Sequence, residues 1–438
     1  MNYIVRGIFW IGLYLLLVLA PLFVLLLVPA PPGTGFVNDL SLALGFAGAA
    51  MMAVMFVLTA RFKRATAPFG IDLIYYFHRQ IALVAVLFVV AHPVLLLVND
   101  PGLWPYLHPA VSPLYLDAGI GSLLALLALV GASLWRKRFG IHYDGWRLWH
   151  LILAIVSLAL AIYHVRGFGY YVNMPWKHGL WTLIALSCLL IVLYVRLLKP
   201  AQLLRHPYRV TAVEQERGDA WTLTLRPEGH AGFTFEPGQF AWLTLWHSPF
   251  ALKEHPFSLA SSAEERQQIR FTIKELGDFT RRIGTVQPDQ LAYVDAPYGA
   301  FSIDRLQAPG YVFIAGGIGI VPIISMLRTL ADRRDRRPLT LIYGYSSWER
   351  LTLREDLEAL QQRLQLKVVY VLGEPHAGWT GETGMLTTEL LARHLPPEKT
   401  ELDYLICGPV PMIHAVERSL SACGISLMKI HSELFDLV

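Results

Sequence analysis

The sequence predicts a multi-domain membrane protein, in which an all-α bundle of six transmembrane helices precedes an antiparallel β-barrel and an α/β domain with a parallel sheet. Long apolar runs dominate residues 1–200, which we assign to the bundle. Short alternating runs, separated by Gly and Pro, fill residues 205–305 and are typical of an antiparallel barrel or sandwich. In residues 308–438, apolar strands alternate with helical stretches, two of which we expect over 320–335 and 350–364, and this indicates a parallel sheet with crossover helices.

Composition excludes several classes of protein. The net charge of +4 comes with no basic stripe that alternates with aromatic residues, so we expect no nucleic-acid partner. The three cysteines (Cys188, Cys407 and Cys423) are too few and too scattered for an iron–sulfur cluster or a zinc site. The sequence also lacks a disulfide framework, which fits a reducing compartment for the soluble part.

Six apolar segments are long enough to cross a lipid bilayer, since one helical crossing needs about 20 residues. The first segment is not followed by a small-residue cleavage pattern, so we expect a retained helix rather than a signal peptide. The segments run over residues 8–30, 40–60, 72–98, 117–135, 146–165 and 178–198.

The loops between these segments differ in charge, which predicts the orientation of the chain. The loops on one side carry only Arg166 and Lys177. By the positive-inside rule, the opposite side is cytoplasmic, together with the N-terminus and residues 200–438, and the third and fifth segments run in the same direction. The basic residues of the predicted cytoplasmic side are Arg6, Arg61, Lys63, Arg64, Arg136, Lys137, Arg138, Arg147, Arg196 and Lys199.

Four histidines lie at equal spacing in two segments, with His78 and His92 in the third and His150 and His164 in the fifth. A separation of 14 residues is almost four turns of α-helix, so both histidines of a segment share one helical face, about 21 Å apart. The topology pairs His78 with His150 near the cytoplasm and His92 with His164 near the outer face. One imidazole from each helix suits a bis-histidine haem, so we predict two haems with these four iron ligands. The other interpretation is four unrelated histidines satisfied by neighbouring polar groups, although ionisable residues in membrane helices are rare and usually functional.

A glycine-rich turn is the clearest motif of the soluble part. The residues Ile314-Ala-Gly-Gly-Ile-Gly-Ile-Val-Pro322 follow a predicted strand and open a predicted helix. Gly316, Gly317 and Gly319 would let the backbone approach a pyrophosphate, whose charge a helix N-terminus favours. Pro322 stands where the usual fingerprint has its last glycine and suits the first turn of a helix. Taken alone, such a match is also compatible with a plain turn.

Five motifs of the soluble part carry a resemblance to known proteins. With them, residues 207–438 resemble the ferredoxin–NADP reductase fold, a flavin-binding barrel followed by a pyridine-nucleotide domain. With the six-helix region in front, the whole chain resembles the ferric reductase and NADPH oxidase family, in which two haems lie between the third and fifth helices. The motifs are His255-Pro-Phe-Ser258, Ile273-Lys-Glu-Leu-Gly-Asp-Phe-Thr280, Pro297-Tyr-Gly299, Gly316-Gly-Ile-Gly319 and Cys407-Gly-Pro409.

The resemblance implies FAD contacts for seven residues of the barrel. Ser258 would lie near the reactive edge of the flavin ring. A basic side chain, a glycine and a hydroxyl are suitable partners for the phosphate oxygens of the cofactor. The residues implied to lie along FAD are His255, Pro256, Phe257 and Ser258, and those implied to hold its pyrophosphate region are Lys274, Gly277 and Thr280.

The same resemblance implies roles at the nucleotide site. Gly316, Gly317 and Gly319 would hold the nucleotide pyrophosphate. The residues implied to act at the point of hydride transfer are Ser258, Cys407, Glu433 and Phe435, with Gly408 and Pro409 beside Cys407 at the nicotinamide.

Two of these residues have a simpler interpretation as well. Phe435 would stack near the flavin ring, but this chain departs from the family pattern because three residues follow Phe435. A core aromatic residue at a chain end is the alternative. For Cys407 the alternative is a small buried residue after a strand.

Nucleotide preference depends on the residues after the predicted strand 339–345. No acidic residue stands directly at its end to bind a ribose 2′-hydroxyl, whereas Arg350 follows a few residues later. Because arginine at such a point accommodates a 2′-phosphate, the sequence favours NADPH over NADH.

The resemblance implies an NAD(P)H-dependent oxidoreductase that passes electrons from cytoplasmic NAD(P)H through FAD and two b-type haems to a small-molecule acceptor outside. That acceptor would be ferric iron, or dioxygen giving superoxide. One alternative is a membrane-bound reductase that serves quinone or a partner membrane protein, and another is a haem-binding sensor without turnover. The compact length and the absence of Asn-X-Ser/Thr sequons favour a bacterial inner membrane, while the oligomeric state is left open.

Overall fold

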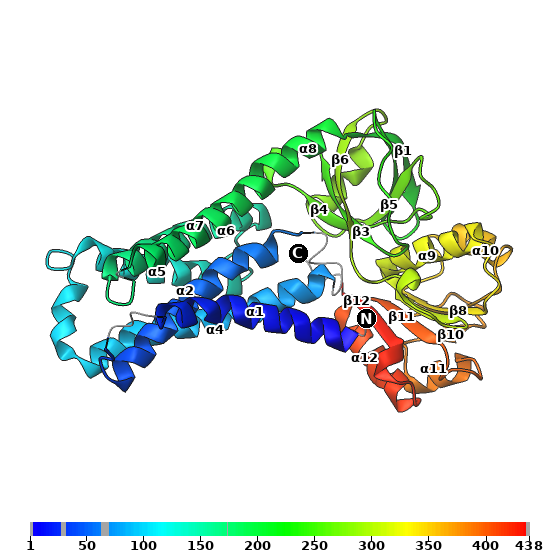
Figure 1. Ribbon diagram of the computed structural model, residues 1–438. Helices are drawn as coiled ribbons and strands as arrows, with labels where there is room; N and C mark the ends of the chain where they lie inside the picture. Colours follow the sequence, from blue (N-terminus) through cyan, green and yellow to red (C-terminus); the bar gives the residue numbers. More distant parts are fainter. Residues whose placement is uncertain (1–2, 28–31, 63–69, 173, 435–438) are drawn as a thin grey trace. The chain divides into compact units, whose positions relative to one another are not determined.

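A computed structural model describes residues 3–27, 32–62, 70–172 and 174–434 (Figure 1). The chain divides at Pro200 into two compact units, one helical and one mixed α/β. The predicted fold class is confirmed, with apolar helices first, then an antiparallel sheet and then a parallel sheet. The exact boundaries predicted for the three domains stay a prediction.

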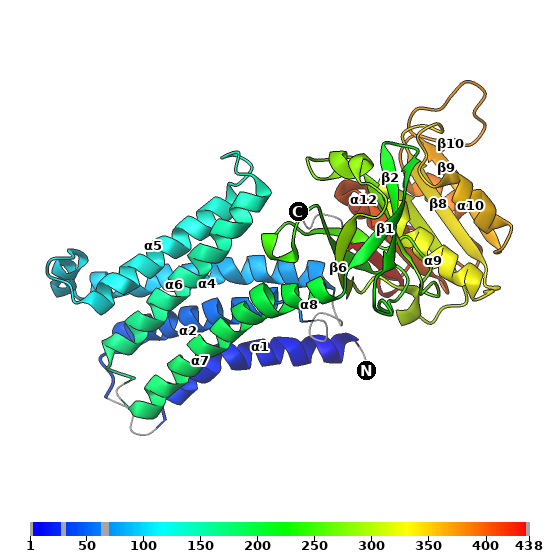
Figure 2. The ribbon, with the colours of Figure 1, turned by 90° about the horizontal axis from the view of Figure 1, so that it is seen from above.

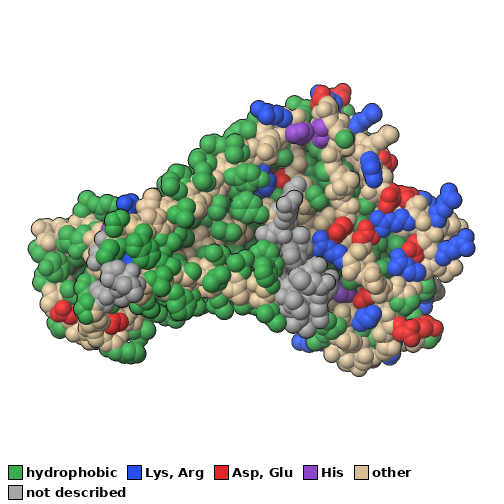
Figure 3. Space-filling view, in the orientation of Figure 1, with side chains coloured by type: hydrophobic (Ala, Val, Ile, Leu, Met, Phe, Trp, Pro, Cys, Tyr) green, Lys and Arg blue, Asp and Glu red, His purple; other side chains and the backbone are tan. Residues whose placement is uncertain are grey.

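The described residues include six helices that are long and apolar enough to cross a membrane. Hydrophobic side chains cover the visible face of this helical unit, whereas charged side chains gather on the α/β unit (Figure 3). The chain is therefore a multi-pass integral membrane protein. Its helices are α1 (Tyr3–Leu25), α2 (Phe36–Thr59), α4 (Ile71–Asn99), α5 (Leu114–Leu134), α6 (Tyr143–Phe168) and α7 (Pro175–Leu193).

The helix ends differ from the predicted ones at two places. Helix α1 ends at Leu25, and the predicted end at residue 30 lies outside the described residues. The sixth segment does not stop at residue 198, because a π-helical stretch (η2, Tyr194–Leu198) joins α7 to α8 (Lys199–Arg205). A short 3₁₀ helix, η1 (Pro101–Leu107), lies between α4 and α5.

Small residues allow the helices of the bundle to approach closely. A Cβ atom on Gly48 of α2 would come within 2.6 Å of Val89 of α4. Helices α5 and α6 lie side by side (Figure 2). They are joined by two reciprocal hydrogen bonds, in which Ser122 and Ser157 each donate to the other's backbone carbonyl at 2.8 Å. These polar bonds fix the register of the two helices within an apolar environment.

The antiparallel sheet closes into a barrel, which decides between the barrel and sandwich interpretations. Its strand order is β4-β3-β6-β1-β2-β5. A bridge between Leu259, which follows β4, and Phe271 of β5 joins the two ends of this order. The strands are β1 (Tyr208–Glu216), β2 (Ala220–Pro227), β3 (Phe240–Leu245), β4 (His255–Ser258), β5 (Ile269–Lys274) and β6 (Leu291–Tyr298), with short helices η3 (Pro249–Ala251), η4 (Thr280–Thr285) and η5 (Ile303–Arg305) between or after them.

The second sheet is parallel throughout and has the order β10-β9-β8-β7-β11-β12. Its elements are β7 (Tyr311–Gly316), η6 (Gly317–Gly319), α9 (Ile320–Asp332), β8 (Leu339–Tyr345), α10 (Arg354–Gln361), β9 (Leu366–Leu372), β10 (Glu382–Thr383), α11 (Thr388–His394), β11 (Asp403–Gly408), α12 (Val410–Ala422), η7 (Leu427–Lys429) and β12 (Ile430–Leu434).

Two helices of this domain are shorter than the sequence predicts. The helix expected over 350–364 begins only at Arg354, because Leu353 has a φ of 58° and cannot continue a right-handed helix. The helix expected over 320–335 ends at Asp332, and Arg334 just beyond it has a φ of 56°.

Phe271 lies in the core of the barrel with none of its surface exposed. We expect Phe271→Ala to destabilise the barrel by about 3–5 kcal/mol through the cavity it leaves. The midpoint of thermal unfolding of the full-length protein, followed by intrinsic tryptophan fluorescence, should fall by several degrees. Phe250→Ala is the matched control, because Phe250 is 44% exposed; equal effects of the two changes would contradict this account of the core.

Candidate functional site

The structure brings the four predicted histidines together as two pairs between helices α4 and α6. The ring centres of His78 and His150 are 6.3 Å apart, and those of His92 and His164 are 6.2 Å apart. We call the first pair the inner pair and the second the outer pair, after the predicted topology. The two pairs therefore have almost the same spacing.

This spacing fits a metal ion held by one nitrogen of each ring. Two metal–imidazole bonds of about 2 Å, with the radius of each ring added, separate the ring centres by about 6 Å. Within the described residues, no cluster of three or more His, Cys, Asp or Glu side chains could hold a metal ion. A pair of facing imidazoles, by contrast, is the set of protein ligands that suits a haem iron.

The hydrogen bonds of the outer pair determine which ring nitrogen carries the proton. The Nδ1 atom of His164 is 2.9 Å from the backbone oxygen of Tyr115, and that of His92 is 2.9 Å from the backbone oxygen of Ser41. A carbonyl oxygen only accepts, so Nδ1 must donate in both rings. The lone pair of each ring is then on Nε2, where a metal ligand needs it.

The side chain of Ser41 strengthens this arrangement. Its hydroxyl donates to the backbone oxygen of His92 at 2.7 Å and lies 3.1 Å from Nδ1 of the same ring. Ser41 has none of its surface exposed. It therefore holds both the backbone and the ring of His92 from the neighbouring helix α2.

In the inner pair, the two rings have different partners. The Nδ1 atom of His150 is 3.1 Å from the hydroxyl oxygen of Ser133 on α5. The Nδ1 atom of His78 is buried and has no hydrogen-bond partner among the described residues. The two pairs are thus equal in spacing but unequal in their hydrogen bonding.

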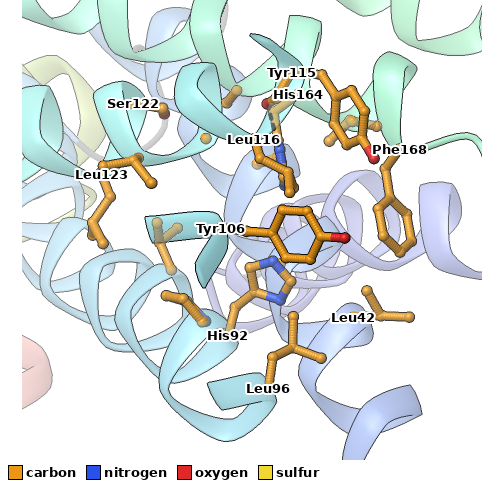
Figure 4. Close-up of a pocket in the computed structure, with 18 of the residues that line it drawn as sticks. Leu42, His92, Leu96, Tyr106, Tyr115, Leu116, Ser122, Leu123, His164 and Phe168 are labelled. Carbon is orange, nitrogen blue, oxygen red and sulfur yellow. Dashed lines mark hydrogen bonds between the residues drawn. The ribbon is translucent and has the colours of Figure 1, made fainter. Parts of the chain in front are cut away.

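A cavity of about 450 Å³ opens beside the outer pair, within the usual range for cofactor sites (Figure 4). His92 and His164 point into it from opposite sides, with Tyr106 and Phe168 around them. Apolar side chains make up most of its wall, and none of the described residues that line it is charged. Such a wall suits the flat, apolar body of a porphyrin.

Two glycines make room for the outer histidines. A Cβ atom on Gly119 would lie 2.7 Å from Nδ1 of His164, and one on Gly45 would lie 3.0 Å from the ring of His92. Neither glycine was singled out in the sequence. Ser41 and Ser133 were not singled out either, because each lies on a helix that carries none of the four histidines.

At the predicted flavin site, Ser258 ends strand β4 with a buried hydroxyl oxygen that has no hydrogen-bond partner among the described residues. A buried hydroxyl without a partner fits a position against a polar cofactor atom. The rings of His255 and Phe257 both contact the ring of Phe279, at centre-to-centre distances of 3.9 Å and 5.9 Å. Pro256 lies between them in the strand. Phe279 belongs to the motif that runs from Ile273 to Thr280, but no role was predicted for it.

The three residues predicted to hold the FAD pyrophosphate differ in their surroundings. The hydroxyl of Thr280 accepts hydrogen bonds from the backbone N–H groups of Leu276 and Gly277, at 2.8 Å and 2.9 Å. Gly277 faces open space, as a Cβ atom there would meet nothing within 4 Å. The ammonium group of Lys274 lies 5.6 Å from the ring centre of Tyr345, in the neighbouring nucleotide domain.

The strand order of the parallel sheet places the glycine-rich turn at a topological switch point. The chain leaves β7 toward β8 on one side, and later returns with β11 on the other side of β7. Ligands of open α/β sheets bind at such a point, beyond the carboxyl ends of the strands. Gly316 ends β7 and Gly408 ends β11, so both predicted motifs meet there.

Close backbone packing explains why glycines stand at this point. A Cβ atom on Gly319 would come within 2.2 Å of the backbone oxygen of Cys407, and one on Gly408 would come within 3.1 Å of the backbone nitrogen of Gly316. Gly317 has a φ of 55°, and a Cβ atom there would meet nothing within 4 Å. Gly317 is thus the glycine that leaves the backbone open to a ligand.

Cys407 and Glu433 are neighbours at the same edge. They are partners in the register of β11 and β12, and both are buried. A Cβ atom on Gly299, from the Pro297-Tyr-Gly299 motif of the barrel, would lie 3.4 Å from Oε1 of Glu433. The edge of the nucleotide domain therefore meets the barrel motif at Glu433. Phe435 lies outside the described residues.

Two remaining predicted residues have structural partners. Pro322 is buried in the first turn of α9, as the sequence indicated. Arg350 forms an ion pair with Asp219, which lies in the turn between β1 and β2 of the barrel. A contact between Arg350 and a nucleotide phosphate would have to compete with this ion pair.

Three family models match successive parts of the chain. The ferric reductase like transmembrane component matches residues 44–161, which include three of the four histidines but not His164. A FAD-binding domain matches residues 219–302, and an oxidoreductase NAD-binding domain matches residues 313–418.

Two curated relatives each match less than half of the chain. NADH-cytochrome b5 reductase 1 of Pyricularia oryzae is 31% identical over 37% of this chain, and the reductase component of propane 2-monooxygenase from Mycolicibacterium smegmatis is 31% identical over 49%. The chain spans 54% and 63% of the lengths of these two proteins. Among solved structures, the FAD/NAD-binding domain of nitric oxide dioxygenase from Vibrio cholerae is 22% identical, with a TM-score of 0.47, over 52% of this chain and 98% of its own.

Burial, with a smaller contribution from the nearby Glu433 carboxylate, raises the pKa of the Cys407 thiol well above its usual value. The thiol should therefore stay protonated throughout the range from pH 7 to 9, and only a thiolate reacts readily with iodoacetamide. We expect peptide mapping by mass spectrometry to find Cys407 unmodified in the folded protein and modified after unfolding. Cys423, which is partly exposed, is the internal control. Alkylation of Cys407 that matches Cys423 and rises with pH would contradict the burial described here.

Proposed function

The chain belongs to the ferric reductase and NADPH oxidase family, and from this premise we propose that it carries electrons from NAD(P)H through FAD and two b-type haems to an acceptor outside the membrane. Its assignment as a multi-pass, NAD(P)H-dependent oxidoreductase follows from the matched transmembrane, flavin and nucleotide domains. The haems, the acceptor and the direction of transfer are the proposed part. The two histidine pairs with equal spacing are the observation that carries the proposal.

Bound FAD would supply the change from two-electron hydride chemistry at NAD(P)H to the one-electron chemistry of a haem. The residues of the chain bind and orient these groups. At the switch point, the open backbone of Gly317 would hold the nucleotide phosphates, while Cys407 and Glu433 would line the nicotinamide at the barrel edge. The hydroxyl of Ser258 would donate to a polar atom of the flavin.

In the membrane, the chain's task is to hold two metals at fixed positions and to exclude water. Three of the four proposed ligands would present Nε2 to the metal, because Nδ1–H is held by a carbonyl or hydroxyl oxygen at His92, His150 and His164. If His92 and His164 together hold the outer iron, the protein would leave no position on the metal for an acceptor, which would then have to approach the edge of the bound group. The helix η1, whose Tyr106 lines the outer cavity, is the segment we propose to form the docking surface.

Several observations bear on the direction of electron transfer and on the identity of the electron acceptor. The positive-inside rule favours a cytoplasmic soluble part, and we propose a bacterial inner membrane as the location. The proposed acceptor is ferric iron, or dioxygen giving superoxide. The relatives' names mention cytochrome b5 and a monooxygenase, so transfer to a partner protein or to quinone is the second candidate. A sensor without turnover is disfavoured by the presence of both the flavin and the nucleotide domains.

Oriented vesicles separate the two candidates. NAD(P)H is added on the side of the flavin domain, and cytochrome c, with or without superoxide dismutase, or a ferric chelate is placed on the opposite side. Reduction of one of these impermeant acceptors is the expected result. If none is reduced while a soluble quinone is, the second candidate replaces the first.

Alanine at His92 should remove the outer haem and leave the inner one. We expect the haem-to-flavin ratio to fall from two to one and outward transfer to fall at least about 100-fold, since loss of an axial ligand breaks the relay. Reduction of flavin by nucleotide should be unchanged. Haem is measured from the dithionite-reduced minus oxidised spectrum. His108→Ala is the control, since His108 is exposed beyond η1; an unaltered haem content in His92→Ala would remove His92 as a ligand.

Two variants test the proposed preference for NADPH, and they should change the nucleotide preference in opposite directions. The name of the cytochrome b5 reductase specifies NADH, whereas Arg350 favours NADPH. If Arg350 binds the 2′-phosphate, Arg350→Ala should lower the ratio of kcat/KM for NADPH to that for NADH by about tenfold, the effect of one charged hydrogen bond. Asp219→Ala releases Arg350 from its ion pair and should raise the same ratio. An unchanged ratio in both variants would exclude Arg350 from nucleotide recognition.

A further inference from the structure

The hydroxyl of Ser133 is the centre of a hydrogen-bond network beside the inner pair. It donates to the backbone oxygen of Leu129 at 2.7 Å. The indole nitrogen of Trp146 lies 3.2 Å from the Ser133 oxygen, and Nδ1 of His150 lies 3.1 Å from it. Three groups thus meet at one oxygen atom.

The donors and acceptors of this network can be assigned completely. A serine hydroxyl has one proton and two lone pairs, and its proton is used on the carbonyl of Leu129. An indole N–H only donates, so Trp146 takes one lone pair. The contact with His150 must therefore be a donation from Nδ1–H to the second lone pair. The tautomer of His150 is fixed in this way, with its lone pair on Nε2.

The acceptor at His150 differs from those at the outer pair. Both outer rings donate to backbone carbonyl oxygens, whereas His150 donates to a hydroxyl oxygen that it shares with Trp146. The cation of Arg136 lies 5.5 Å from the centre of the Trp146 ring. This charge draws electron density from the indole, so the hydrogen bond from Trp146 to the Ser133 oxygen becomes stronger. The Ser133 oxygen is then a weaker acceptor for the hydrogen bond from His150.

We propose that Ser133 is a positioning residue that sets the reduction potential of the inner haem through His150, and that Trp146 acts against it. This inference rests on the proposed function, because it requires iron at His150. A hydrogen bond from Nδ1–H to an acceptor makes the imidazole a better electron donor to its metal. Better donation stabilises ferric over ferrous iron, and so it lowers the potential. The shared acceptor at His150 keeps this effect smaller at the inner pair than at the outer pair.

The two residues should therefore shift the inner potential in opposite directions. Ser133→Ala removes the acceptor, so the inner potential should rise. The expected change is about tenfold in the one-electron reduction constant, which equals about 59 mV. Trp146→Phe keeps an aromatic ring against His150 but frees a lone pair of Ser133, so the potential should fall by a smaller amount. A general loosening of the bundle would not give opposite signs.

The measurement is a spectroelectrochemical titration of the full-length holoprotein in detergent, with low-spin ferric EPR spectra of the same samples. His92→Ala, which retains only the inner site, identifies which of the two transitions belongs to it. Ser133→Thr keeps a hydroxyl that can still donate to the carbonyl four residues earlier, and should titrate like the unaltered protein. Ser157→Ala removes a buried hydroxyl from the same helix pair without touching an imidazole, and should shift neither transition.

The outcomes separate this inference from the proposed function. If the unaltered protein has no haem absorbance, the proposed function fails. If two haems are present but Ser133→Ala and Trp146→Phe shift the inner transition in the same direction, or shift both transitions equally, the inference is wrong. Loss of the inner haem from Ser133→Ala with retention in Ser133→Thr supports the positioning role, whereas loss from both variants overturns it.

Discussion

A polar side-chain atom inside a bilayer needs a partner, and three of the four imidazoles find one for Nδ1 in a way that leaves their second nitrogen for a metal. The Nδ1 atom of His78 has no such partner among the described residues. Where Nδ1–H is held by an oxygen of a neighbouring helix, the second nitrogen carries a lone pair. His92 and His164 point toward one another across their cavity (Figure 4). Two facing lone pairs repel unless an electron-pair acceptor lies between them. The hydrogen bonds to Ser41 and Tyr115 therefore support metal binding more directly than the presence of histidine does.

The positions of the four histidines could be predicted from the sequence because helical periodicity within one segment determines them. A 14-residue spacing on α4 and on α6 is sufficient to form two pairs once both helices run in the same direction. The acceptors could not be predicted in this way. Ser41 and Ser133 lie on α2 and α5, and nothing in the local sequence indicates which of the many serines of the bundle will face an imidazole. Gly45 and Gly119 remained unrecognised for the same reason.

In the soluble unit, the motifs predicted which residues matter, and the strand order explains why they meet. Gly316 and Gly408 are far apart in the sequence, but they end two neighbouring strands at the switch point. Sequence rhythm predicts that a parallel sheet exists but not its strand order. Helix ends were predicted less well. Leu353 and Arg334 have left-handed backbone conformations, which leucine and arginine rarely adopt, so the residue types gave no indication of them. Ser258 was predicted from its motif, whereas its buried, unpartnered hydroxyl is a tertiary property.

The bundle divides two tasks between two sets of helices. Helices α4 and α6 supply all four proposed ligands, while α2 and α5 supply the oxygen atoms that orient them. Helix α5 serves both pairs, through Tyr115 at one end and Ser133 at the other. Between these positions, Ser122 is bonded reciprocally to Ser157 of α6, which prevents the two helices from sliding. Because the proposed ligands and their acceptors lie on different helices, a substitution on α2 or α5 could change the electron donation of an imidazole without moving the metal that it would hold.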